Sequence, residues 1–279
     1  MTSIENLDSN SVKALLRSPL EANQQIGLAL IKSMEIIKDD ELISLMADNS
    51  NKLIWCQEYG LTNAVSIIKL DRTFYGSGID LSPFVNLEKL YFNQQLFQSN
   101  QILFKAFPKL KTLSFTGQRL RKFPKAIRRL QKLETLYLGN NRLTELPSEL
   151  GQIKNLRVLI LSKNKLQSLP AALLKLAHLK NLNLANNRFS KITPKLEQLQ
   201  NLEVLNLSHN LLERIPSEMA ALSNLRILNL TGNNISSLPI TFWKLSQLER
   251  LHLTNNPIAK DNFLINRLKT MLPHTQIKH

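Results

Sequence analysis

Residues 133–153 read LETLYLGNNRLTELPSELGQI, and residues 156–176 read LRVLILSKNKLQSLPAALLKL. The second stretch repeats the first after 23 residues, with apolar residues at the first, fourth, sixth, eleventh, fourteenth, eighteenth and twenty-first places. A fixed period of this length indicates a stack of equal structural units. The same spacing fits nine units up to the end of the chain, which start at Val65, Leu87, Leu110, Leu133, Leu156, Leu179, Leu202, Leu225 and Leu248.

Each unit predicts one strand and one return segment. In residues 133–138 the apolar residues Leu136 and Leu138 alternate with residues that point outward, which is typical of a strand with one buried face. From Leu143 to Ile153 the apolar spacing is three or four, which favours a helical or turn-like return. Because one unit cannot bury both halves alone, neighbouring units share an apolar column. We therefore expect an α/β stack that curves like a horseshoe, with a parallel sheet on its concave side.

A column of asparagines follows the strand in most units. A buried side-chain amide both donates and accepts hydrogen bonds, so it can join successive turns of the stack. We interpret this column as structural and not as a ligand site, and we expect looser turns where Gln95 and Gln118 replace it. Its members are Asn141, Asn164, Asn187, Asn210, Asn233 and Asn256.

The two ends of the chain depart from the repeat, as the exposed ends of a stack require. Ser18-Pro19-Leu20-Glu21 is typical of a helix start, so residues 1–64 are predicted to form a helical N-terminal cap before the repeats of residues 65–260. Residues 261–279 are predicted to form a C-terminal cap with a short strand at Thr275–Ile277. Its helix is expected over Asp261–Met271, with Phe263, Leu264, Leu268, Met271 and Leu272 inward.

With its Leu-Pro pairs, such as Leu146-Pro147 and Leu169-Pro170, the repeat resembles the leucine-rich repeat family. The match is best to its 23-residue intracellular, Ras-suppressor-like class, and the helical lead-in is similar to that of bacterial members. The resemblance implies a solenoid that binds a protein partner on its concave face.

Several classes of protein are disfavoured by composition. The start of the chain lacks a secretory signal, no stretch approaches the ~20 apolar residues of a membrane helix, and Cys56 has no partner for a disulfide. These features predict a cytoplasmic protein, although secretion without a signal remains open. The five histidines have no metal-ligand spacing and the eight glycines form no phosphate loop, so we expect no enzyme activity, no cofactor and no metal.

The net charge of +15 is unevenly divided, with −4 on residues 1–64 and +19 on the rest. Residues 105–132 hold ten basic residues and no acidic one. Three interpretations stay open for this basic run: a solvated face, a contact for an acidic protein, or a site for nucleic acid or anionic lipid. Apart from Lys111, its members are Lys105, Lys109, Arg119, Arg121, Lys122, Lys125, Arg128, Arg129 and Lys132.

The outward strand positions are the predicted site for a protein partner. Tyrosine and arginine are frequent in binding hot spots, although exposed strands also carry aromatic and β-branched residues without any ligand. Trp243, at a partly exposed convex position, is a second candidate, either for a partner or for covering its neighbour. The residues predicted on the concave face are Tyr91, Tyr137, Arg157, Val158, Ile160, Asn183, Asn206, Asn229 and His252.

The sequence thus predicts a non-enzymatic protein-interaction module that binds through its concave face. It leaves the oligomeric state open, with a monomer favoured. The alternative is a basic protein that binds nucleic acid or anionic membrane through the basic run.

Overall fold

The computed structural model describes residues 14, 57, 62–63, 65–70, 81–92, 107–123 and 125–279. It divides into two compact units, residues 1–110 and 111–279. The predicted N-terminal cap lies outside the described residues except at Ala14, Gln57 and residues 62–63, so it stays a prediction. Lys105 and Cys56 also lie outside them.

The first unit contains two described strands, β1 (Ile67–Leu70) and β2 (Lys89–Phe92), which pair in parallel. Their alternation follows the sequence pattern, since Ile68 and Leu90 are buried while Lys69 lies beside Tyr91 on the other side of the pair. The first predicted repeat, which starts at Val65, therefore contains a strand at the expected place.

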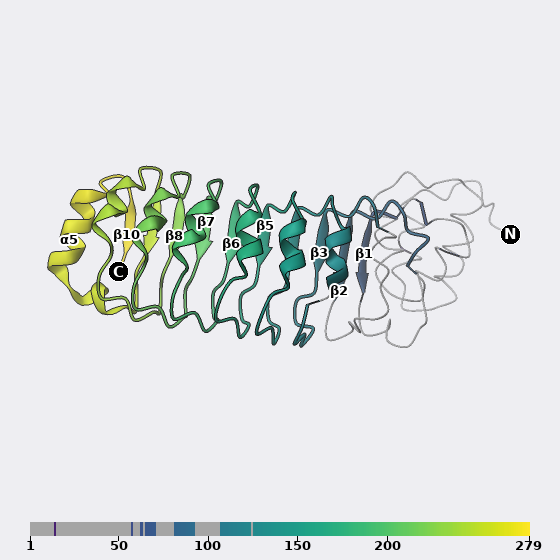
Figure 1. The fold of residues 1–279 in the computed structure, drawn as a ribbon, viewed down its shortest axis with the longest axis horizontal. Coiled ribbons are helices and arrows are strands. Elements are labelled where there is room, and N and C mark those ends of the chain that lie inside the picture. The colour runs from purple at the N-terminus through teal and green to yellow at the C-terminus, as the bar shows by residue number, and fades with distance from the viewer. Residues whose placement is uncertain are drawn as a thin grey trace. The chain divides into compact units, whose positions relative to one another are not determined.

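The second unit is a row of parallel strands in chain order, in which each strand from β3 to β9 pairs residue by residue with the strand that follows it (Figure 1). From β3 to β9 the paired residues lie 23 positions apart, which is the period found in the sequence. The strands are β3 (Thr112–Ser114), β4 (Thr135–Tyr137), β5 (Val158–Ile160), β6 (Asn181–Asn183), β7 (Val204–Asn206), β8 (Ile227–Asn229), β9 (Arg250–His252) and β10 (Gln276–Lys278).

The return segments are short 3-10 helices, which lie on the side of the stack away from the strands (Figure 1). Proline explains where several of them begin. Pro147, Pro170 and Pro216 directly precede η5, η6 and η8 with φ between −70° and −66°, the angle that the proline ring imposes. The helices are η4 (Lys125–Arg129), η5 (Ser148–Gln152), η6 (Ala171–Lys175), η7 (Pro194–Gln198), η8 (Ser217–Ala221), η9 (Ile240–Lys244) and η10 (Pro257–Lys260).

The core is the apolar column between the strands and the 3-10 helices. The middle leucine of each of β3 to β9, such as Leu136 or Leu159, is fully buried, and so are the apolar residues that start the next segment, such as Leu138 and Leu161. Gly151 lets two neighbouring helices approach, since a Cβ at this residue would lie 2.2 Å from the backbone oxygen of Ala172. The helices η5 and η6 thus pack closely at this point, which a larger residue at position 151 would prevent.

The asparagine column joins neighbouring repeats from within. Asn187 is typical: its Nδ2 donates to the carbonyls of Leu161 and Leu184, both at 3.0 Å, and its Oδ1 accepts from the backbone nitrogen of Leu166 at 3.0 Å. The five other asparagines of the column make the same three bonds. These side chains therefore pair buried backbone groups that the strands and helices leave over.

The residue before each of these asparagines adopts a left-handed conformation, with φ from 54° to 67° in the six repeats from residue 140 onward. Asparagine and glycine tolerate this region, which accounts for Asn140, Asn186, Asn255 and Gly232 at this place. The turn after β3, where Gln118 replaces asparagine, is less regular: both Gly117 and Arg119 are left-handed there.

The C-terminal end is closed by α5 (Asn262–Met271) and β10. The Asp261 carboxylate caps the helix by accepting a hydrogen bond from the Leu264 nitrogen at 3.0 Å. The prediction for Phe263 was wrong, since this side chain is 73% exposed. Leu268 and Leu272 are buried as predicted, Leu264 and Met271 are half-buried, and Ile265 is a buried residue that the prediction missed. Ile265, Leu268 and Leu272 are spaced by three and four, which keeps them on one side of the helix. The closing strand begins one residue later than predicted.

Candidate functional site: the strand face of the second unit

The strand face consists of the side chains that β3 to β10 direct away from the core, the face that the sequence predicted as concave. The first and third residues of each strand point outward, and most of them are half-buried. The first outward column is Thr112, Thr135, Val158, Asn181, Val204, Ile227, Arg250 and Gln276. The second outward column is Ser114, Tyr137, Ile160, Asn183, Asn206, Asn229, His252 and Lys278.

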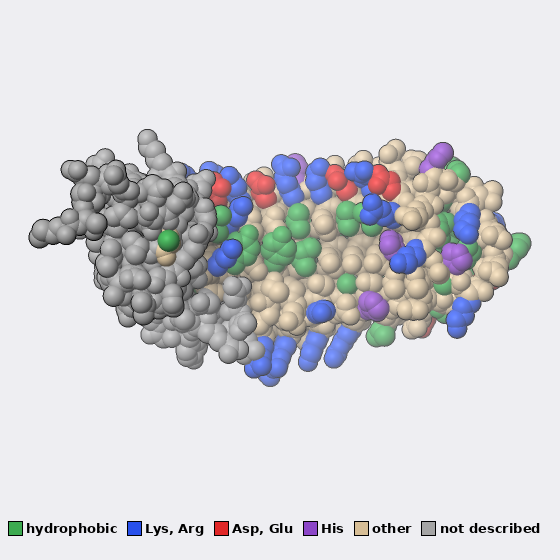
Figure 2. Space-filling view, turned by 180° about the vertical axis from the view of Figure 1, so that it is seen from behind, with side chains coloured by type: hydrophobic (Ala, Val, Ile, Leu, Met, Phe, Trp, Pro, Cys, Tyr) green, Lys and Arg blue, Asp and Glu red, His purple; other side chains and the backbone are tan. Residues whose placement is uncertain are grey.

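An apolar cluster occupies β4 and β5. Tyr137 lies directly beside Ile160, and Val158 is the other outward residue of β5. All three side chains are half-buried, so a partner would find apolar surface without any rearrangement of the core. Figure 2 shows hydrophobic side chains in a band along the middle of the visible face. Tyr91, predicted with this cluster, belongs to β2 of the first unit and is described only there.

The next three strands carry asparagines in the second column. In Asn183, Asn206 and Asn229 the side-chain oxygen accepts a hydrogen bond from the backbone nitrogen two residues later, at 3.0 Å in each case. Their Nδ2 groups donate to no described residue. Each amide therefore stabilises its own turn with the oxygen and presents two N–H donors at the surface.

One edge of the strand face, just before each strand, carries charges of both signs. Lys180 and Glu203 form an ion pair at 2.7 Å, and Arg226 Nε donates to Glu249 Oε1 at 2.7 Å. The hydrogen bond to Glu249 raises the pKa of Arg226. Arg157 occupies the equivalent place, but no described carboxylate forms an ion pair with it. Of these cations, Arg157 is thus the one that neighbours leave available beside the apolar cluster.

The described members of the predicted basic run belong to both units and to different parts of the repeat, so a single patch stays a prediction. Lys109 lies in the first unit, where its Nζ donates to Asn86 Oδ1 at 2.8 Å. Arg119, Arg121 and Lys122 lie in the turn after β3. Lys111 directly precedes β3. Four further members lie on the helical side, where Lys125 forms an ion pair with Glu149 at 3.7 Å. The pKa of Glu149 is lowered mainly by a backbone hydrogen bond. These helical-side residues are Lys125, Arg128, Arg129 and Lys132.

The stack forms a second basic cluster, which shares only Arg119 with the basic run and which we call the basic ridge. It consists of Arg119, Arg142, Lys165 and Arg188, which occupy the tenth place of four consecutive repeats and are all exposed. No described carboxylate forms an ion pair with any of them. Figure 2 shows a row of Lys and Arg side chains along the lower edge of the face. The sequence contained this signal, because the tenth place is basic in these four consecutive repeats, but residues 23 positions apart do not form a run.

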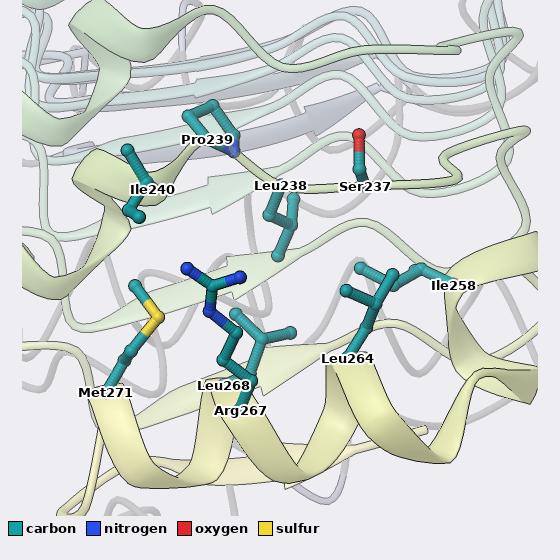
Figure 3. Close-up of a pocket in the computed structure, with 9 residues that line it drawn as sticks. All are labelled: Ser237, Leu238, Pro239, Ile240, Ile258, Leu264, Arg267, Leu268 and Met271. Carbon is teal, nitrogen blue, oxygen red and sulfur yellow. The ribbon is translucent and has the colours of Figure 1, made fainter.

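The helical side holds the second predicted candidate. Trp243 is 57% exposed, and Lys244 Nζ lies 5.7 Å from the centre of its ring. A cavity of about 150 Å³ lies between η9, the segment before it and α5 (Figure 3). Ile240, Leu264 and Met271 contribute to its apolar lining, while Arg267 brings the charged group. This cavity offers little chemistry beyond packing.

Groups suited to metal chemistry are not found in this part of the chain: among the described residues no three His, Cys, Asp or Glu side chains gather as metal ligands. The helices that the structure describes are also too short or too polar to cross a membrane.

The comparisons with known proteins agree with this architecture. A family model described as a leucine-rich repeat region matches residues 79–212, and one described as leucine rich repeat matches residues 200–258. No curated protein matches the chain in sequence.

Solved structures are similar to the chain as well. A TDR receptor shares 28% identity and a TM-score of 0.57, over 71% of this chain and 36% of the receptor chain. Internalin C2 of Listeria monocytogenes shares 25% identity and a TM-score of 0.56, over 67% of this chain and 80% of the internalin. A leucine-rich repeat protein of Leptospira interrogans shares 20% identity and a TM-score of 0.39, over 83% of this chain and 99% of its own. With its repeating strands, its asparagine ladder and the two matching models, the chain belongs to the leucine-rich repeat family.

Proposed function

We propose that this chain is a non-enzymatic interaction module that binds a protein partner on its strand face, with the apolar cluster Tyr137, Val158 and Ile160 at the centre. One observation carries the proposal. The inward residues of the strands are almost invariably leucine, whereas the outward residues change from apolar to amide to cationic along the same columns. Leucine-rich repeats generally mediate protein–protein interaction, which supports this assignment.

The physical basis of binding is a rigid platform. The strands are held by backbone hydrogen bonds to their neighbours and from within by the asparagine ladder, so the backbone loses little freedom when a partner docks. Arg157 adds a cation beside the apolar cluster, and Tyr and Arg, together with Trp, are enriched in binding hot spots. In the first unit, Tyr91 is proposed to serve the same purpose on β2.

The test is capture of the partner from a cell lysate, with mass spectrometry to identify it. The variant Tyr137→Ala/Ile160→Ala removes the apolar cluster and is expected to abolish capture while the protein stays folded. A matched control, Ile240→Ala/Trp243→Ala, removes two exposed apolar side chains on the helical side and should capture the partner normally. Loss of capture in the control alone would place the interface on the helical side and refute the proposal.

The basic ridge favours a second candidate function, binding of nucleic acid or anionic membrane. Four exposed cations at one place of consecutive repeats lie about 5 Å apart along the stack, which suits a row of phosphates. The test measures the affinity for single-stranded oligothymidine at several salt concentrations. Replacing Arg119, Arg142, Lys165 and Arg188 with Gln should make the negative slope of log K against log salt shallower by about 3.

The control for this candidate neutralises Lys125, Arg128, Arg129 and Lys132 on the helical side instead. An equal effect of the two variants would show that net charge acts without a defined site. Vesicles with and without anionic lipid provide the corresponding membrane measurement, in which binding should require the ridge if lipid is the ligand.

A further inference from the structure

A shallow, open hollow of about 540 Å³ lies over β9 and β10, the last two strands of the strand face. Its lining comes from the outward positions of β9 and β10, together with Ile277. Gln276 lies beside Arg250 and Lys278 lies beside His252, because β10 pairs with β9 in parallel. The closing strand therefore adds one more residue to each outward column and creates the hollow.

The hollow is cationic. Arg250 and Lys278 are exposed side chains on either side of the half-buried His252, and no acidic residue lines the site. Burial lowers the pKa of His252, and the neighbouring charges of Lys278 and Arg250 lower it further. The nearest acid in the sequence, Glu249, is paired with Arg226 of the preceding repeat. The positive charge at this end of the face is thus not neutralised by the described residues around it.

The rest of the second column leads from the apolar cluster to this hollow. The Nδ2 groups of Asn183, Asn206 and Asn229 present N–H donors on three consecutive strands, immediately before His252. A row of amide donors suits the carbonyl oxygens of a peptide, while an apolar cluster at one end and cations at the other suit its side chains.

We propose that the hollow formed by Arg250, His252 and Lys278 binds a carboxylate side chain of an acidic, extended segment in the protein partner. This inference rests on the proposed function, since it names the chemistry of the segment that the strand face takes. From Ile160 on β5 to His252 on β9 there are four strand steps of ~4.8 Å, or about 19 Å. An extended chain covers this distance in about six residues. The partner segment therefore carries an apolar residue and an acidic residue about six positions apart.

The probe for the hollow is the capped peptide acetyl-tetraglutamate amide, titrated at constant ionic strength while the His252 ring is followed by NMR. We expect saturable shifts of the His252 signals and a higher pKa of its imidazole in the complex, because a bound carboxylate favours the protonated ring. Affinity should accordingly rise as the pH falls from 7.5 to 5.5, and His252→Asn should lose this pH dependence.

Charge-removing variants locate the site. Lys278→Gln and Arg250→Gln should each weaken the peptide about fivefold or more, as loss of a charge-assisted hydrogen bond does. The matched control Lys165→Gln removes one exposed, unpaired cation from the basic ridge and should leave the affinity unchanged. Equal weakening by Lys165→Gln, or the absence of saturable shifts at His252, would overturn the proposal.

Inorganic phosphate is the competing ligand. Tighter binding of phosphate than of tetraglutamate would show a site for phosphate and not for an acidic peptide. The two proposals can fail separately. If Tyr137→Ala/Ile160→Ala still captures the partner, the function proposed for the strand face is refuted. The His252 titration still shows whether the hollow binds a carboxylate.

Discussion

The two sides of each strand in the second unit differ in how much they vary. On the inward side, Leu113, Leu136, Leu159 and their counterparts up to Leu251 are the same residue type at every repeat, and all are fully buried. On the outward side, the residues paired across the same strands change from Tyr137 to Asn206 to His252. The inward residues are constrained because each must fill the same space in the apolar column, whereas the outward residues are not constrained by packing in this way. We therefore propose that recognition of a partner depends on the outward residues that differ between repeats.

The largest effect should come from the inward side. Leu159→Ala opens a cavity in the apolar column, because the side chain is fully buried between two neighbouring leucines, Leu136 and Leu182. We expect it to lower the free energy of unfolding by about 2–5 kcal/mol in a urea titration. Ile160→Ala, one residue away on the outward side, should cost clearly less. Equal costs would remove the distinction between the two sides.

The next effect comes from the buried asparagines. Asn210→Ala deprives the carbonyls of Leu184 and Leu207 and the nitrogen of Phe189 of their partner. Unpaired buried groups cost about 1–3 kcal/mol each, so a loss of at least this size is expected in the same titration. A loss below 1 kcal/mol would mean that water replaces the amide in the ladder.

Asn206→Ala, in the same repeat, is the matched substitution on the outward side. Its oxygen accepts one hydrogen bond, from the Ser208 nitrogen, and it lies on the surface. We expect a loss of about 0.5–1.5 kcal/mol, the net value of one ordinary hydrogen bond. Comparable losses for Asn206→Ala and Asn210→Ala would show that the two asparagine columns have the same structural weight, contrary to their contacts.

The smallest effect concerns pH. Because burial, Lys278 and Arg250 lower the pKa of folded His252, the unfolded chain binds more protons between the folded value and the unfolded value of about 6.5. His252 therefore does not lower the free energy of unfolding above about pH 6.5. It lowers this free energy as the pH falls from about 6.5 to the pKa of the folded state. Measured between pH 7.5 and 5, wild type should lose more stability than His252→Asn. The opposite order would mean that His252 gains a partner on protonation.

Much of the fold could be predicted from the sequence, because it repeats. The period of 23 residues gave the strand positions, the parallel register and the return segments, and the Leu-Pro pairs marked where η5 and η6 begin. The failures lie where the repeat ends. Phe263 was wrongly placed inward because the stripe of a single capping helix, unlike a column of nine units, is not averaged over copies.

The candidate site was predicted only in part. Tyr137 and Ile160 could be placed side by side from the period alone, and the structure has them in register. The basic ridge and the contribution of Lys278 were missed, since Arg119 and Arg188 are 69 residues apart and β10 has no repeat signature. The basic run of the sequence, by contrast, is divided between the turn after β3 and the helical side.

The sequence by itself determined the architecture, because burial of an apolar column in identical units leaves one way to stack them. Only the tertiary structure decided which polar groups remain available. Asn183 and Asn187 are the same residue type four positions apart, but their side chains differ in availability. Asn183 presents its N–H groups on the strand face, whereas the side-chain amide of Asn187 donates to and accepts from buried backbone groups. Lys180 and Lys165 likewise differ, because the ion pair that occupies Lys180 depends on Glu203 in the adjacent repeat. Such pairings depend on which atoms face each other across neighbouring strands and turns, and this is a property of three-dimensional contact.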